Sequence, residues 1–359
     1  MNNRFDYVEF GECNLDDPFF ASLKADYPEF TSWFQRKASA SEKAYVHVDE
    51  NGIHAFEYLK DECEEISLSD ATIPMKKRIK IGTLKIGDDL RGQRLGEGLI
   101  GIALWNWQAS GYDEIYATVF PKHNTLMGLM DKFGFCQAGQ NERGELIFLK
   151  SKLHLDTSDP YKMFPFLPGN FRYAKYIPIR ATYHDTLFPY SMLARTKQTA
   201  LNIAVANGIS KMYIGTPQDT NLNYHPNTPI LIYRISDAPN RRTYLSAVSS
   251  FGVVTNFHII KQRGNELCSE NDFIRIAGNK SFFSDAELRD IYRGNWNIVT
   301  IEVLYNGYFG EGNNVNHAWL KANGYFPAYP YKIDLPPEAF RHVLQKGGKD
   351  DESIIFHQP

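Results

Sequence analysis

Two glycines stand at the start of a segment that otherwise has the pattern of a helix. The stretch RGQRLGEGLI (91–100) leads into the long apolar run GLIGIALWNW (98–107). A glycine inside a helix costs about 1 kcal/mol relative to alanine, so Gly96 and Gly98 indicate a need for bare backbone. Amide groups at a helix start, together with the positive end of the helix dipole, form a site for an anion such as phosphate. The sequence therefore predicts an anion site at this helix start.

The spacing of these residues excludes two familiar phosphate loops. The pattern is Gln93-x-x-Gly96-x-Gly98. It matches neither the G-x-G-x-x-G pattern of dinucleotide-binding proteins nor the G-x-x-x-x-G-K-S/T pattern of nucleoside triphosphatases. The alternative interpretation is a turn in an α/β core that needs glycine for close packing alone.

Strands and helices alternate around the glycine turn. Asn51-Gly52 is a strong hairpin signal between YVHVDE (45–50) and IHAFEYLKD (53–61). The run RIKIGTLKI (78–86) alternates and predicts the strand before the turn. The other expected elements are a helix over 96–110, a strand over 112–120, a short helix over 123–133 and a strand over 145–153.

The glycine pattern resembles the pyrophosphate-binding motif, Arg/Gln-x-x-Gly-x-Gly/Ala, of the GNAT superfamily of acyl-CoA N-acyltransferases. The order of the neighbouring segments is also similar, since EIYATVF (114–120), HNTLMGLMDKF (123–133) and Gly134-Phe135 follow the long helix. The resemblance covers about residues 40–154. It implies a GNAT-type mixed sheet flanked by helices, acetyl-CoA as co-substrate, and direct attack of an amine on the thioester.

The resemblance also implies where the cofactor lies. Backbone amides from Arg94 to Gly98 would hold the pyrophosphate, and the strand over 80–86 would pair with the pantetheine arm. Family members often carry an asparagine at the start of the next helix, and Asn124 lies one residue from that place. The expected cofactor-binding residues are Leu84, Lys85, Ile86, Gln93, Arg94, Leu95, Gly96, Glu97, Gly98 and Asn124.

The chain departs from the family pattern at the catalytic acid. Many members have a tyrosine that protonates the leaving thiolate, but this chain has Met130 there, which cannot donate a proton. We expect His123 to donate instead, or Tyr116 from its strand. Glu57 is the candidate base. For each of the three, an ordinary surface or core role is the alternative interpretation.

The back half is rich in expected strands. PILIYRIS (229–236) followed by YLSAVSSFGVVTNF (244–257) resembles PUA-like domains of the ASCH and EVE kind, over about residues 200–345. The resemblance implies a small β-barrel that binds RNA or modified nucleobases. Helices are expected over 190–207 and over 284–293, the second with Ser284 as N-cap and Glu287 completing a capping box.

Candidate nucleic-acid contacts in the back half are of two kinds. Aromatic side chains can stack on bases, and cationic side chains can bind phosphates. A core position is the alternative for each aromatic residue, and an ordinary charged loop is the alternative for the cations. The candidates are Trp296, Trp319, Tyr213 and Tyr233 for stacking, and Arg234, Arg241, Arg242, Lys261 and Arg263 for phosphate.

Length and composition are those of two globular domains. The 359 residues are 43% hydrophobic, and no run approaches the ~18 apolar residues of a membrane helix. The beginning of the chain lacks the layout of a signal peptide, and the four cysteines form no C-x-x-C pair. We therefore expect a cytoplasmic protein without a metal.

The formal net charge is −3, but the charge is unevenly divided. Residues 1–154 hold 18 Lys and Arg against 24 Asp and Glu, whereas residues 155–345 hold 19 against 15. An acidic front half and a mildly basic back half favour different partners for the two.

Together these patterns predict an α+β protein in four segments. They are a GNAT acetyltransferase domain (1–154), an ordered connector rich in proline and aromatic residues (155–191), a PUA-like nucleic-acid-binding domain (192–345) and a polar tail (346–359). The expected activity is acetyl-CoA-dependent N-acetylation of an amine on RNA, such as an aminoacyl-tRNA or a nucleobase, in a toxin or defence role. The alternatives are acetylation of proteins or small amines, and a non-catalytic reader of modified nucleic acid that senses acetyl-CoA.

Overall fold

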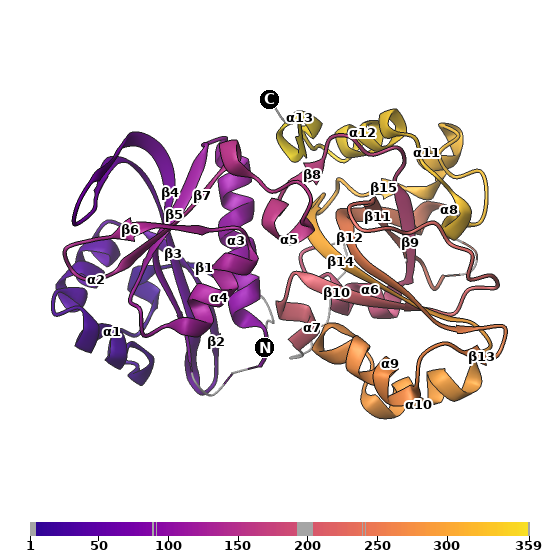
Figure 1. Cartoon of the computed structure of the whole chain (residues 1–359), viewed down its shortest axis with the longest axis horizontal. Helices are drawn as coiled ribbons and strands as arrows, with labels where there is room; N and C mark the ends of the chain where they lie inside the picture. Colours follow the sequence, from indigo (N-terminus) through magenta and orange to yellow (C-terminus); the bar gives the residue numbers. More distant parts are fainter. Residues whose placement is uncertain are drawn as a thin grey trace. The chain divides into compact units, whose positions relative to one another are not determined.

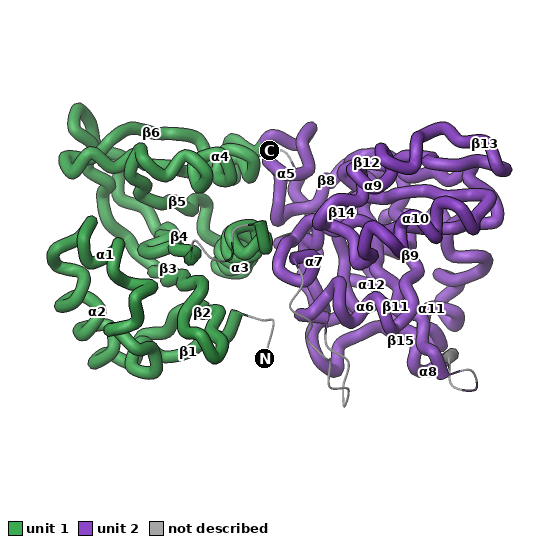
Figure 2. Tube along the Cα trace, turned by 90° about the horizontal axis from the view of Figure 1, so that it is seen from below, with its two compact units in different colours: residues 1–155 green, residues 156–359 purple. Residues whose placement is uncertain are grey.

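The computed structural model describes residues 5–87, 90, 92–191, 204–238, 240 and 242–357. The chain divides into two units, Met1–Leu155 and Asp156–Pro359, which Figure 2 distinguishes by colour. Each unit combines a sheet with helices (Figure 1), so the expected α+β fold class is confirmed. Most of the expected helix over 190–207 lies outside the described residues.

A seven-stranded mixed sheet forms the first unit, in the order β1-β2-β3-β4-β5-β7-β6. Neighbouring strands are antiparallel except β4 and β5, which are parallel and are connected through a helix. The expected hairpin at Asn51-Gly52 is confirmed as β2–β3. The strands are β1 (Asp6–Glu9), β2 (Lys43–Asp49), β3 (Gly52–Ser67), β4 (Thr72–Ile86), β5 (Glu114–Val119), β6 (Cys136–Gln140) and β7 (Leu146–Ser151).

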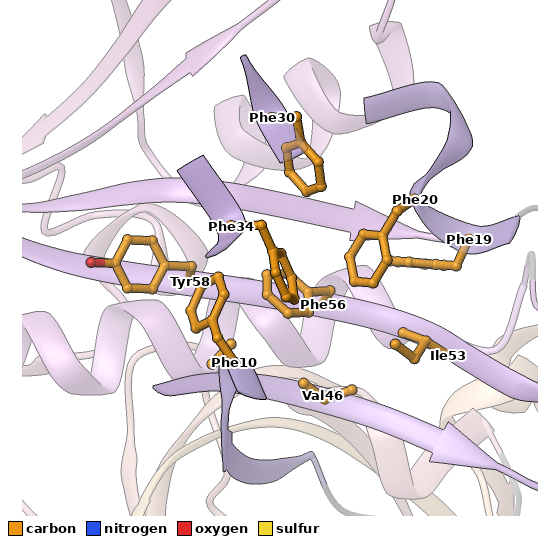
Figure 3. Close-up of a cluster of buried hydrophobic side chains, with 10 residues drawn as sticks. Phe10, Phe19, Phe20, Phe30, Phe34, Val46, Ile53, Phe56 and Tyr58 are labelled. Atoms are coloured by element: carbon orange, nitrogen blue, oxygen red, sulfur yellow. The ribbon is translucent and has the colours of Figure 1, made fainter. Parts of the chain in front are cut away.

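Helices cover both faces of this sheet. Phe56 and Tyr58 of β3 pack with Phe34 and other aromatic residues beneath α1 (Ala21–Asp26) and α2 (Phe30–Ser39), as Figure 3 shows. The opposite face lies under α3 (Leu95–Ser110), because Tyr45 of β2 accepts a 3.1 Å hydrogen bond from Asn106 of that helix. Residues on every side of α3 are buried, which explains why its sequence is a nearly continuous apolar run. α4 (Asn124–Lys132) follows β5.

The second unit is built on a curled sheet in the order β10-β14-β12-β11-β9, with β13 and β15 also paired to β12. β9 and β11 are parallel, and the other pairs are antiparallel. The strands are β9 (Lys175–Arg180), β10 (Ser210–Gly215), β11 (Pro229–Ile235), β12 (Ala247–Gln262), β13 (Asn265–Glu266), β14 (Ile298–Tyr308) and β15 (Val315–Asn316).

Short helices surround this second sheet. The expected capping box is confirmed, because Ser284 and Glu287 exchange backbone and side-chain hydrogen bonds at the start of α10. The helices are α5 (Pro160–Met163), α6 (Ala181–Leu187), α7 (Ala204–Asn207), α8 (Arg242–Leu245), α9 (Glu270–Ala277), α10 (Asp285–Gly294), α11 (His317–Ala322), α12 (Pro337–Lys346) and α13 (Asp351–Ile354). The 3-10 turns given in full among the described residues of both units are η1 (Phe10–Glu12), η2 (Pro18–Phe20), η4 (Lys152–His154), η6 (Gly278–Lys280) and η7 (Pro330–Lys332).

Two expected segments need correction, because both bury apolar side chains in the second unit. The expected connector, 155–191, supplies β9 to the sheet, and its residues Phe164 and Tyr176 are fully buried. The expected tail, 346–359, contains β16 (Ile355–Phe356), which pairs in parallel with β8 (Leu167–Pro168). Proline and polar composition concealed two integral parts of the unit.

Candidate active site

β4 and β5 run side by side for a short distance and then separate. Their pairing extends from Arg78–Glu114 to Ile81–Ala117. In the described structure the rest of β4, residues 82–86, pairs with β3 alone, while the end of β5 pairs with β7. Amide and carbonyl groups on an open strand edge can bind an extended ligand. The opening therefore offers backbone partners to an elongated molecule.

A β-bulge lies where the two strands separate. Tyr58 and Leu59 are consecutive on β3, but their partners on β4 are Thr83 and Ile81, so Gly82 is the extra residue. A bulge bends its strand and increases the local twist. A Cβ atom on Gly82 would lie only 3.0 Å from Cδ1 of Tyr58, so glycine allows the bulged strand to lie against that ring. The bend accounts for the separation of β4 from β5.

The start of α3 packs against the end of β4. Arg94 occupies the N-cap position with a left-handed φ of 59°, and the first-turn amides that follow have no acceptor within the helix. A Cβ atom on Gly96 would lie 3.0 Å from Cδ1 of Ile86 and 3.2 Å from Cδ2 of Leu129. Close packing thus gives a sufficient reason for glycine at position 96, and this packing brings the helix start next to the open strand edge.

Charged side chains near the turn have internal partners. Nη2 of Arg94 lies 2.7 Å from Oε1 of Glu97, and this ion pair offsets a carboxylate that would otherwise repel an anion. Lys85 donates to the carbonyl of Phe19 and, at 2.6 Å, to the hydroxyl of Ser22. The side chain of Lys85 therefore holds η2 and α1 and is already committed within the unit.

Glu57 is fully buried on the face of the sheet beneath α3. It is the cross-strand partner of Tyr45, which bonds to that helix, and of Leu84 on β4. Neither carboxyl oxygen has a hydrogen-bond partner in the described structure, and burial raises the pKa of Glu57 well above its ordinary value. A carboxyl that is fully buried and has no described hydrogen-bond partner is out of reach of a substrate, so this arrangement gives no support to Glu57 as the base.

Tyr116 lies on the opposite face of the sheet. Its hydroxyl donates to the buried carboxylate of Glu62 on β3, and Nζ of Lys80 lies 5.2 Å from the centre of its ring. Burial first, and then the hydrogen bond to Glu62, raise the pKa of the Tyr116 hydroxyl. The hydroxyl points back toward β3 and away from the opening, which makes it a poor proton donor there.

His123 remains accessible. It occupies the N-cap position of α4 without capping the helix through its side chain, and both His123 and Asn124 are exposed. These residues directly follow the end of β5, whereas Met130 is fully buried. The three predicted catalytic residues therefore do not converge, and His123 is the one among them with an accessible side chain near the opening.

The sequence analysis missed a cluster at the end of β5. The register pairs Val119 with Leu146 and so brings Glu145 beside Phe120. Tyr27 donates a 2.6 Å hydrogen bond to Glu145, and its ring centre lies 5.5 Å from that of Phe120. Because Tyr27 and Glu145 are 118 residues apart, no local pattern could reveal this pair. The cluster puts a buried carboxylate and two aromatic rings on the α1–α2 side of the sheet.

The predicted phosphate contacts do not form one patch. Arg234 is nearly buried and donates to both oxygens of Asp185, at 2.8 and 2.9 Å. Lys261 is nearly buried and donates at 2.7 Å to the carbonyl of Tyr292. Arg263 is exposed. Arg241 and the side chain of Arg242 lie outside the described residues.

The predicted stacking residues also differ in exposure. The hydroxyl of Tyr213 donates to the carbonyl of Pro178. The hydroxyl of Tyr233 lies 2.9 Å from Nδ1 of His317. Trp319 packs at a centroid distance of 5.0 Å from the ring of His342. By contrast, Trp296 is 74% exposed. Among these four, the core interpretation is favoured for all but Trp296.

A buried polar chain around Arg234 predicts sensitivity to acid. Nε2 of His184 lies 2.6 Å from the Ser249 hydroxyl, and Nδ1 lies 2.8 Å from Asp185. The order is that of a hydrolase triad, but Ser249 and His184 are both 0% exposed, so no substrate reaches them. Burial lowers the pKa of His184, although Asp185 acts in the opposite direction.

The lowered pKa of His184 should make the folded protein less stable in acid. The unfolded chain binds a proton at this histidine below about pH 6.5, while native His184 stays neutral. We therefore expect stability to fall as the pH drops from about 6.5 toward the lower native pKa. When the pH is lowered from about 8 to about 5, the unfolding temperature of the wild type should fall by more than that of His184→Asn. Equal losses in both proteins would contradict the prediction.

The described residues bear on two further kinds of site, a metal-ligand cluster and a membrane-spanning helix. Within the ranges given above, no group of three or more His, Cys, Asp or Glu side chains could hold a metal ion. None of the described helices has both the length and the apolar character needed to cross a bilayer.

No protein-family model matches the chain, and no curated protein matches its sequence. Among solved structures, a variant of the toxin AtaT bound to the C-terminus of the antitoxin AtaR and acetyl-CoA is similar at 17% identity and a TM-score of 0.30, over 40% of this chain and 91% of that one. The PaiA N-acetyltransferase of Thermoplasma acidophilum with coenzyme A is similar at 14% identity and a TM-score of 0.27, over 37% and 75% of the two chains.

The protein ZmASCH from Zymomonas mobilis, solved as a variant, is similar at 13% identity and a TM-score of 0.32, over 50% of this chain and 98% of that one. All of these likenesses are low in identity and in TM-score.

Proposed function

We propose that the first unit is an acetyl-CoA-dependent N-acetyltransferase. The observation that carries the proposal is the open edge of β4, residues 82–86, beside the start of α3. An extended pantetheine arm would pair with the strand edge, and the pyrophosphate would reach the amides at the helix start. The proposed cofactor contacts are those expected from the sequence.

The proposed reaction needs an amine without its proton. The amine nitrogen attacks the carbonyl carbon of the thioester, a C–N bond forms and the C–S bond breaks. The thiolate of coenzyme A then takes up the proton that the attacking nitrogen loses. Glu145 would attract the ammonium form of the acceptor on the α1–α2 side, and the ammonium would release one proton to water before the attack. Exposed His123 would donate the proton that the thiolate takes up and would regain one from the attacking nitrogen, so that the imidazole is unchanged overall.

We propose that the acceptor is an amine carried by RNA. The support is the excess of cationic over acidic residues in 155–345 and the exposed Trp296 and Arg263 in the second unit. The α-amino group of an aminoacyl-tRNA is the first candidate, because its pKa near ~8 leaves a fraction unprotonated at neutral pH. Its acetylation would block translation, as in a toxin or defence system.

The first experiment uses acetyl-CoA labelled in the acetyl group. The protein is incubated separately with charged tRNA, uncharged tRNA, a protein mixture and polyamines, and label transfer is measured. We expect label on charged tRNA. Label on uncharged tRNA would indicate a nucleobase acceptor, whereas label on proteins or polyamines would contradict the RNA-linked substrate.

A non-catalytic role is the second candidate function. It is favoured by the observation that Glu57 is sealed beneath α3 and that Tyr116 is committed to Glu62. A sensor would bind acetyl-CoA, measured by calorimetry, and leave the thioester intact with every acceptor. If the protein does not bind acetyl-CoA at all, both candidate functions are wrong.

A further inference from the structure

The hairpin between β12 and β13 ends in an unusual two-residue turn (near the β13 label in Figure 1). Gln262 pairs with Asn265, so Arg263 and Gly264 form the turn. Their φ angles are 49° and 82°, and two positive values are typical of a type I′ turn. Asn-Gly is favoured in such turns, whereas a long side chain is disfavoured in the left-handed region. The chain therefore keeps an arginine at a position that suits asparagine better.

The indole ring of Trp296 lies on this turn. The amide of Gly264 donates a 2.9 Å hydrogen bond to the carbonyl of Trp296. A Cβ atom on Gly264 would lie 3.5 Å from Cε3 and 3.6 Å from Cζ3 of the ring. One face of the ring thus rests on bare backbone, while the side chain as a whole is the most exposed large hydrophobic residue among those described, at 74%. The opposite face is open to a ligand.

Hydrogen bonds fix the backbone that carries the ring. The Asn297 side chain accepts at 2.8 Å from the amide of Arg263 and donates at 2.9 Å to the carbonyl of Gln218. Gln262 donates at 2.7 Å to the hydroxyl of Thr220. These bonds hold together the β12–β13 turn, the segment that carries Trp296, and residues 218–220. A fixed aromatic ring loses little conformational freedom when it binds, so it binds tightly for its size.

Among the described charged residues near the ring, Arg263 is the cation without an ion pair within 4 Å, and its charge interacts with Asp219 at longer range. Glu266 has Lys261 at 3.6 Å, and Asp219 has Lys332 at 3.4 Å. The exposed guanidinium of Arg263 makes no ion pair within 4 Å in the described part of the chain. The side chains next to the ring in sequence are amides, Asn295 and Asn297, so an apolar protein surface would find few partners here.

We propose that Trp296 and Arg263 form a binding site for an unpaired nucleotide of RNA. The base stacks on the open face of the indole, and Arg263 binds the adjacent phosphate. This inference gives a location to the RNA recruitment in the proposed function, and it rests on that part alone, not on acetyl transfer.

The test measures binding of a short fluorescein-labelled single-stranded RNA to the full chain. We expect Trp296→Ala to weaken binding by roughly 5- to 150-fold, the range for loss of one base-stacking contact. Tyr244→Ala is the matched control, because Tyr244 is 71% exposed on α8 and outside the proposed site. The control should bind RNA like the wild type.

Arg263→Asn separates binding from structure. Asparagine is favoured in the turn, so this variant should unfold at a higher temperature than the wild type. It should nevertheless bind RNA more weakly, and the slope of log affinity against log salt should shrink by about 0.7, the value for one lost phosphate contact on a single strand. A purely structural arginine would not give opposite changes in stability and binding.

Two results would overturn the proposal. One is a wild-type protein that does not bind the RNA, which would leave a protein as the partner of this surface. The other is equal RNA binding by Trp296→Ala and Tyr244→Ala. Calorimetry with acetyl-CoA on the same variants keeps the two proposals apart. A protein that binds RNA through Trp296 but does not bind acetyl-CoA would retain this site and lose the proposed enzymatic function.

Discussion

Gly96→Asp should abolish most acetyl-CoA binding while Gly96→Ala retains it. Both substitutions add the same Cβ atom, which would meet the flexible ends of Ile86 and Leu129 at 3.0 and 3.2 Å. Only the aspartate puts a negative charge at the proposed pyrophosphate site. Like charges brought together at an interface cost several kcal/mol, so we expect about 100-fold weaker binding for the aspartate variant than for the alanine variant.

The aspartate should not disturb folding more than the alanine does. A carboxylate in the first turn of a helix interacts favourably with the helix dipole, so Gly96→Asp should unfold at or above the temperature of Gly96→Ala. Calorimetric titration at low and high salt gives the measurement, because salt screens the repulsion and should narrow the difference between the variants. Equal losses of affinity in both variants would mean that the glycine serves packing alone.

The elements around α3 could be predicted from local pattern, because each carries its own signal. The alternating run 78–86 became the end of β4, and the apolar run after Gly96 became α3. Residues 61–77 gave no such signal, since ion pairs such as Lys60 with Glu62 and Lys76 with Glu114 stabilise that part of the sheet. Polar composition there concealed the full length of β3 and β4, although a strand was predicted over part of each.

The candidate site was harder to predict, because side-chain direction depends on tertiary packing. Glu57 and Tyr116 both lie on strands next to the opening, but they face opposite sides of the sheet. The sequence cannot say which side α3 covers, and that choice decides which of the two side chains is sealed. Tyr27 and Glu145 meet only because the α1–α2 connection reaches the end of β5, which no spacing along the chain encodes.

Glu57→Leu should stabilise the protein. The substitution replaces a fully buried carboxyl that has no described hydrogen-bond partner with an apolar side chain of similar size. Burying an unpaired polar group costs about 1–3 kcal/mol, so the free energy of unfolding should rise by about that amount at neutral pH. Thermal or denaturant unfolding of the full chain measures this change.

The gain in stability of Glu57→Leu over the wild type should increase as the pH rises, because the pKa of native Glu57 is raised. Below about pH 4.3 the carboxyl is protonated in both the native and the unfolded chain, so ionisation contributes nothing there. As the pH rises, the unfolded chain ionises while native Glu57 keeps its proton, and the wild type loses stability relative to the variant. Glu57→Gln isolates this effect, because glutamine retains a buried polar group but cannot ionise.

The Glu57→Gln variant also decides between a structural and a catalytic glutamate. If Glu57 is a buried acid without a role in the reaction, Glu57→Gln should gain stability relative to the wild type as the pH rises above about 4.3 toward the raised native pKa. It should also transfer acetyl groups at the wild-type rate. A base would behave differently: the variant would lose activity with unchanged acetyl-CoA binding. Loss of stability at every pH would instead mean that the native carboxyl has a hydrogen-bond partner, since a buried group with a partner is costly to replace.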